Sequence, residues 1–137
     1  MWLYYKSRKI FLNPNEILMD KINIAEKLAF FSDHWNPRII GELNGQHVKL
    51  VKLKGEFVWH KHDEEDELFL VLDGVLLMEF RNETIIVGKG EIIIVPKGVE
   101  HRPVAPEEVS VMLFEPASTL NTGDSRGELT RDTLNRI

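Results

Sequence analysis

The sequence predicts an all-β fold in which short antiparallel strands form a barrel or a sandwich. From residue 37 onward, apolar runs rich in β-branched and aromatic residues recur at short, regular intervals. Residues that favour turns, namely Gly, Pro, Asn and Asp, separate these runs. Helical and strand patterns do not alternate, which argues against a parallel α/β sheet.

Size and composition fit one globular domain. The chain has 137 residues, of which 43% are hydrophobic and 28% are charged, and such a chain can bury a full core. It contains no cysteine, which excludes disulfides, thiolate zinc sites and cysteine nucleophiles. Any metal site must therefore use histidine, carboxylate and water. The lack of disulfides suits a reducing cytosol, so we expect a cytoplasmic protein.

The charge pattern disfavours two kinds of partner. The formal net charge is −5 and no basic cluster occurs, so binding to nucleic acid is not expected. No apolar run approaches the roughly 20 residues of a membrane span. Lys6, Arg8 and Lys9 interrupt the region where a signal peptide would have its apolar core, so no secretion signal is predicted.

The chain divides into three predicted parts. Residues 1–36 form an N-terminal extension with a short helix, residues 37–116 form the barrel, and residues 117–137 form a tail. The tail is polar and rich in Gly, Thr and Asn. We expect it to be a surface extension with a short helical turn near Leu129.

A single helix is predicted in the N-terminal part. Pro14 argues against one continuous helix through the first 18 residues. The helix is expected over residues 22–31, with Asp20 or Asn23 as its N-cap. The apolar residues at helical spacing are Ile22, Ala25, Leu28 and Ala29.

The first two strands carry the clearest turn signal. Asn44-Gly45 is a residue pair that two-residue hairpin turns favour. Ile39-Ile40 should therefore pair with a strand at 47–53. Gly55 interrupts the second strand, and extended character resumes at 57–59.

The later strands follow from apolar runs that end at turn residues. Turns are expected at Asp73-Gly74, at 81–83, at 88–90 and at Pro96. The predicted strands cover 68–72, 76–80, 84–87, 91–95 and 109–114.

Four residues could form a metal site. His60 and His62 lie two apart in an extended segment, so both imidazoles should point to the same face. Glu67 begins the next strand and can lie on a strand paired with the histidine segment. His101 follows the turn Pro96-Lys-Gly98, which can bring it back toward the first pair.

These residues and their neighbouring glycines resemble the two motifs of the cupin superfamily. The first motif reads Gly55-EFVW-His60-Lys-His62-DEED-Glu67-LFLVLD-Gly74. The second motif reads Gly90-EIIIV-Pro96-Lys-Gly98-VE-His101. Flanking strands extend the similarity across residues 37–116. Two positions depart from the pattern, because the spacer before His60 is one residue short and Ala105 stands where an Asn is frequent. Neither is a ligand position, so the departures concern the pocket shape and the subfamily.

The resemblance implies a small single-domain cupin, a double-stranded β-helix also described as a jelly-roll-like antiparallel barrel. It implies one divalent metal ion per chain. Three imidazoles and one carboxylate suit Fe, Mn, Ni or Zn, and the ligand set does not choose among them. The ligands that the resemblance implies are His60, His62, Glu67 and His101.

Other polar candidates have more ordinary explanations. The acidic residues 63–66 are better explained as a solvated loop than as ligands. His47 could line the pocket but is better read as an ordinary strand histidine, and His34 as a structural residue. Lys97 and Arg102 could contact an anionic substrate, although a surface position is favoured for both.

Two classes of function stay open at this point. The resemblance implies a metal-dependent enzyme on a small organic substrate, with dioxygenase chemistry first and sugar isomerase chemistry second. The alternative is a non-catalytic, metal-dependent small-molecule binding or sensor protein. Residues 1–36 offer one credible helix, so no helix-turn-helix for DNA binding is available. Single-domain cupins commonly dimerise, and the apolar strands could supply the contact, so a homodimer is expected.

Overall fold

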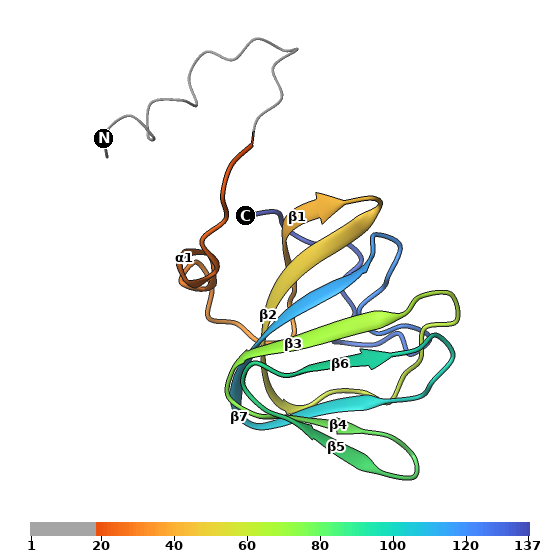
Figure 1. The fold of residues 1–137 in the computed structure, drawn as a ribbon. Coiled ribbons are helices and arrows are strands. Elements are labelled where there is room, and N and C mark those ends of the chain that lie inside the picture. Colours follow the sequence, from red (N-terminus) through yellow and green to blue (C-terminus); the bar gives the residue numbers. More distant parts are fainter. Residues whose placement is uncertain (1–18) are drawn as a thin grey trace.

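The computed structural model describes residues 19–137, and Figure 1 shows their fold. The predictions made for residues 1–18, including the break at Pro14, lie outside the described residues. The strands pair with one another in antiparallel orientation throughout, which confirms the all-β prediction. The elements are α1 (Ile24–Leu28), β1 (Arg38–Leu43), β2 (Gln46–Glu56), β3 (Glu67–Asp73), β4 (Leu76–Glu79), β5 (Thr84–Val87), β6 (Ile92–Val95) and β7 (Arg102–Pro116).

The helix α1 is shorter than the sequence predicts. It spans five residues instead of the expected 22–31. The side chain of Asn23 accepts a hydrogen bond from the Glu26 amide at 2.9 Å, so Asn23 and not Asp20 is the N-cap. None of the helical residues is buried, and α1 lies outside the sheet (Figure 1). Helices in proteins gain most of their stability from packing an apolar face. Because this helix buries no residue, no packing stabilises further helical turns. No helix within residues 19–137 has the length and apolarity needed to cross a membrane.

The predicted hairpin between β1 and β2 is confirmed. Leu43 pairs with Gln46 across the turn. Asn44 and Gly45 have φ values of 49° and 75°. Left-handed backbone at both central residues is what a type I′ turn requires, and Asn-Gly supplies it with little strain.

β7 is longer than predicted and joins the two sides of the barrel. It begins at Arg102, whereas the expected strand began at 109. Its first part contains Pro103 and Pro106, and because proline is disfavoured in paired strands, the pattern did not predict a strand there. This first part pairs with β4, and the later part lies between β2 and β3. The strand order is β1-β2-β7-β3-β6, and β4 joins β5 to β7.

The core lies inside the curved sheet and is formed by alternate residues. On β7, Val109, Val111 and Leu113 point inward, and on β2 Val51 and Leu53 do so. Strand side chains alternate between faces, so one face of each strand supplies the core. The remaining buried members of the cluster are Trp35, Phe57, Phe69, Val71, Leu76, Met78, Val87, Val95 and Ala105.

The tail is not only the surface extension that the sequence suggested. Thr122 is fully buried, and its hydroxyl lies 2.7 Å from that of Thr130. The last residues run beside β1 (Figure 1), where the Ile137 amide donates to the Ile39 carbonyl at 3.1 Å. The region near Leu129 forms a turn and no helix. The tail is therefore packed against the barrel by specific backbone and side-chain hydrogen bonds.

Candidate metal centre

The histidine segment follows the alternation that the sequence predicts. His60 and His62 are 3% and 5% exposed, whereas the side chain of Lys61 between them is 39% exposed. Both imidazoles therefore point inward, as expected. The segment is not a continuous strand, since its bridge to other strands is limited to the pair His60 and His101.

Backbone hydrogen bonds join the two motifs. The His60 amide donates to the His101 carbonyl at 3.1 Å, and the His101 amide returns a bond at 2.9 Å. The Gly98 amide donates to the His62 carbonyl at 2.7 Å. The turn after Pro96 thus brings His101 back to the first pair, as predicted. These backbone hydrogen bonds fix the positions of His60, His62 and His101 relative to one another.

Glu67 reaches the site from a different strand pair than expected. The sequence allowed its strand to pair with the histidine segment. Instead, β3 pairs with β6 and β7, and Glu67 lies opposite Val95. Both backbone groups of His60 and the carbonyl of His62 are already bonded to the second motif, so these groups are not available to β3.

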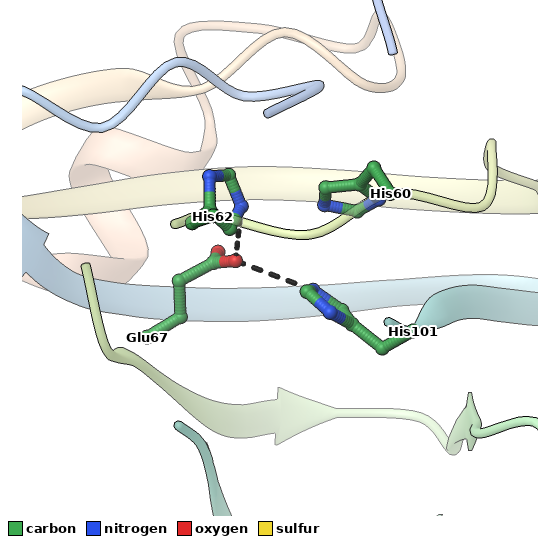
Figure 2. A group of neighbouring side chains, drawn as sticks. All are labelled: His60, His62, Glu67 and His101. Atoms are coloured by element: carbon green, nitrogen blue, oxygen red, sulfur yellow. Dashed lines mark ion pairs between the residues drawn. The ribbon is translucent and has the colours of Figure 1, made fainter. Parts of the chain in front are cut away.

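The four side chains converge on one point (Figure 2). One ligand atom from each of them can be chosen so that all lie within 4.8 Å of one another. The Nε2 atom of His62 lies 2.5 Å from Glu67 Oε1, and that of His101 lies 3.3 Å from the same oxygen. The members of this group, all buried, are His60, His62, Glu67 and His101.

Two imidazoles are held in the tautomer that a metal ligand needs. His60 Nδ1 donates to the Val58 carbonyl, and His101 Nδ1 donates to the Val99 carbonyl, each at 2.9 Å. A carbonyl only accepts hydrogen bonds, so Nδ1 carries the proton and Nε2 presents its lone pair. Outer hydrogen bonds of this kind orient histidine ligands.

The donor atoms that face the centre lack hydrogen-bond partners. His62 Nε2, Glu67 Oε1 and His101 Nε2 are buried and have none within the described residues, although they lie close to one another. Their short separations do not have the angles of hydrogen bonds. Buried polar groups are normally paired, and an unpaired one is costly. A positive ion at their meeting point would satisfy all of them, so these four residues could hold a metal ion.

The electrostatics favour the protonation state that metal binding requires. Burial lowers the pKa of His60 to about 4, and His101 adds to the effect. Burial raises the pKa of Glu67, but the neighbouring imidazoles of His101 and His62 outweigh it, so the pKa falls well below its usual range. Neutral imidazole and ionised carboxylate are the forms that coordinate metals.

A cavity of about 40 Å³ adjoins the centre. Its wall is mainly apolar and aromatic. The rings of Trp35 and Phe57 stack there with their centroids 4.8 Å apart. This wall was not predictable from the sequence, since Trp35 precedes the first strand and nothing in its local pattern points to the site. The lining residues are Trp35, Pro37, Val51, Leu53, Phe57, His60, Glu67, Phe69, Pro103, Leu113, Glu115 and Asn121.

A buried ion pair at the cavity was also missed. Lys49 Nζ lies 2.7 Å from Glu115 Oε1, and each side chain is 2% exposed. Burial raises the pKa of Glu115 well above its usual range, with Glu67 adding to the rise and Lys49 opposing it. Among residues 19–137, Glu115 Oε2 has no hydrogen-bond partner. The available signal was strand alternation, because Glu115 continues the inward series of Val111 and Leu113.

The structure places the other polar candidates away from the centre. His47 Nε2 lies 3.6 Å from Glu42 Oε2, and His34 Nε2 lies 2.7 Å from Glu108 Oε2. Neither histidine lines the cavity.

The flanks of the second motif likewise lie outside the cavity wall, and the favoured surface position holds for Lys97, which is exposed. Arg102 Nε donates to Glu79 Oε1 at 2.7 Å. The Lys97 amide donates to Asp66 Oδ1 at 2.8 Å, so one residue of the acidic loop supports the turn.

An antiparallel β barrel with a buried group of three histidines and one glutamate defines the class of protein. The family described as "Cupin domain" matches residues 47–115. The chain therefore belongs to the cupin superfamily, as the two motifs indicated.

Similar proteins agree with this family. A cupin-2 domain containing protein from Shewanella frigidimarina is 48% identical, with a TM-score of 0.69, and the match covers 69% of this chain and 93% of that one. Protein NMB1881 from Neisseria meningitidis is 32% identical, with a TM-score of 0.66, over 72% of this chain and 100% of that one. The uncharacterized protein YdbB of Bacillus subtilis is 40% identical over 80 residues, which span 58% of this chain and 65% of that relative.

Proposed function

We propose that this cupin binds one divalent metal ion and acts as a metal-dependent enzyme on a small organic molecule. The observation that carries the proposal is the set of buried donor atoms without partners, which face one point beside a cavity. The proposed ligands are His60, His62, Glu67 and His101. This donor set is compatible with Fe, Mn, Ni or Zn, and the bound ion would supply Lewis-acid or redox chemistry.

The cavity wall favours dioxygenase chemistry over sugar isomerisation. Trp35, Phe57, Phe69 and Leu113 offer apolar surface to a ligand, whereas a sugar presents several hydroxyls that each need a polar partner. Beyond the proposed metal ligands, the polar side chains on the wall are Glu115 and Asn121, and the Asn121 amide is already bonded within the tail. The enclosed volume of about 40 Å³ is far below the roughly 300–1,000 Å³ of typical ligand pockets, so only a very small molecule, or part of a larger one, would fit inside it.

Oxygen consumption tests the enzymatic part of this proposal. The protein is loaded with Fe(II) under argon and then transferred to air-saturated buffer. It should consume dioxygen when small phenols are added, and the His62→Ala variant should not. Sugar phosphates assayed for isomerisation provide the second arm. If the loaded protein binds a phenol by calorimetry but turns over neither class, the alternative of a metal-dependent binding or sensor protein replaces the enzyme.

We further propose that the protein is a homodimer. Ile85, Ile94 and Val99 line a common groove with Phe80, and the first three are 39%, 56% and 36% exposed. Arg81, Glu83 and Glu100 also line the groove, and exposed apolar surface with a polar rim is typical of protein contacts. A second copy of the chain, covering this patch, is the partner we propose.

Sedimentation tests the dimer. The chain mass is 15.9 kDa, and the wild type should sediment at twice that mass at micromolar concentration. Ile94→Lys should shift the protein to monomer, because a charge in an apolar contact is costly to desolvate. Leu43→Lys, at a residue 48% exposed that lies outside the groove, is the control and should leave the mass unchanged. A monomeric wild type contradicts the proposal.

A further inference from the structure

The tail crosses directly over the residue between the two proposed histidine ligands. The Lys61 amide donates to Asp124 Oδ1 at 2.9 Å. In return, the Asp124 amide donates to the Lys61 carbonyl at 3.1 Å. Asp124 thus engages both backbone polar groups of Lys61. The matched family region ends at residue 115, so this contact comes from outside it.

A glycine allows the tail to approach closely. Gly123 has a φ of +53°, and a Cβ atom at this position would lie 2.2 Å from the Lys61 carbonyl oxygen. It would also lie 3.2 Å from Cδ2 of the His60 ring. Distances below about 3 Å from backbone cannot be kept, so any side chain here would push the two segments apart. The tail backbone therefore packs against the imidazole of a proposed ligand.

Polar contacts hold this part of the tail in one arrangement. The Asn121 side chain donates to the Leu129 carbonyl at 2.8 Å and accepts from the Arg131 amide at 2.9 Å. Thr122 is fully buried beside the Thr130 hydroxyl. The side chains of Asn121 and Thr122 are thus bonded inside the tail, which holds the segment carrying Gly123 in one conformation.

We infer that residues 121–124 form a clamp on the Lys61 backbone that positions His60 and His62 for metal binding. The segment itself contributes no ligand, so Gly123 and Asp124 are positioning residues. The inference rests on the proposed metal function. One side of the segment that carries His60 and His62 is bonded to the second motif, through His101 and the Gly98 amide. The clamp holds the other side, which faces the tail. Removing outer contacts that orient metal ligands typically costs 10–100-fold in affinity.

Four variants and the Co²⁺ ion test the clamp. Gly123→Ala and Asp124→Ala should each weaken Co²⁺ binding about 10–100-fold in a chelator competition. Both should also alter the visible absorption of bound Co²⁺, which reports the arrangement of the ligands. Asp124→Asn should restore the wild-type spectrum, because its amide oxygen accepts the same bond from Lys61. The matched control is Gly127→Ala, whose Cβ meets nothing within 4 Å.

Amide exchange in the metal-free protein gives an independent measurement. With a chelator present, the Lys61 amide should exchange faster in Asp124→Ala than in wild type, while the core amide of Val111 keeps its protection. This arm also shows whether the variant barrel is folded.

The outcomes separate the clamp from the metal function. Wild-type Co²⁺ affinity and an unchanged spectrum in both Gly123→Ala and Asp124→Ala would overturn the clamp. If the wild type binds no Co²⁺, the proposed metal function fails, and the exchange of Lys61 decides the clamp alone. Faster exchange in Asp124→Ala then supports it, and unchanged exchange overturns it.

Discussion

Replacing His101 by alanine should remove most of the metal ion that we propose for this protein. The imidazole is fully buried, its Nε2 atom faces the centre without a hydrogen-bond partner in the described part of the chain, and its loss leaves three donors. We expect a loss of affinity greater than the roughly 10–100-fold that outer-shell changes cause. His62→Ala should behave similarly, and the double replacement of His60 and His62 should abolish binding.

Elemental analysis of protein purified without a chelator or a histidine tag measures this effect. Lys61→Ala is the matched control, since that side chain is partly exposed and sits between the two ligand positions. Its metal content should equal that of the wild type. Full occupancy in the His101 variant would show that the second motif does not supply a ligand.

Acid should release the proposed metal ion, because protons compete with the ion for the imidazoles. Free histidine titrates near pH 6.5, and burial, with a contribution from His101, lowers the pKa of His60 to about 4. In the metal-free protein, the unfolded chain therefore binds more protons than the folded one between these values. The stability that neutral His60 contributes is fully present above about pH 6.5 and is lost as the pH falls toward 4. Thermal unfolding with a chelator at several pH values measures the loss.

Lys49→Met should cost about 3–5 kcal/mol of unfolding free energy, the range found when one partner of a buried ion pair is removed. The change leaves the Glu115 carboxyl 2% exposed with neither oxygen bonded to a cation. The double variant Lys49→Met with Glu115→Leu should recover most of the loss, because both buried charges then disappear together. Urea unfolding in the presence of a chelator measures the effect without a contribution from bound metal.

Lys54→Met provides the comparison on the same strand. Lys54 is exposed, and surface substitutions usually change stability by less than about 0.5 kcal/mol. If Lys49→Met loses no more stability than Lys54→Met, the pair does not support the fold. A double variant as unstable as the single one would instead assign the cost to packing, not to an unpaired carboxyl.

Local chemistry made much of the fold and the proposed ligand set predictable. Asn44-Gly45 specifies a turn through the backbone angles that these two residues tolerate. His60 and His62 share a face because extended side chains alternate, whether or not the segment pairs as a strand. The spacing of Glu67 and His101 completes the two motifs, and the four side chains do converge.

Features that depend on distant partners were not predictable in this way. The sequence placed Glu67 on a strand beside the histidines, yet β3 pairs elsewhere. The first part of β7 was not predicted because it contains two prolines. Proline lacks the amide hydrogen that strand pairing uses, and the energetic cost depends on whether a neighbouring strand would accept a hydrogen bond at that position. The helix prediction extended too far because the pattern cannot tell whether an apolar face finds something to pack against.

The sequence by itself determined the family, the turns and the identity of the four candidate ligands, because each follows from residues near one another in the chain. Only the tertiary structure showed that Lys49 and Glu115 form a buried pair at the cavity. It alone also showed that Gly123 and Asp124 lie on the backbone of Lys61. The physical reason is the same for both. A charge or a glycine acquires its role from what packs against it, and those partners lie 66 residues away for Lys49 and 63 for Lys61.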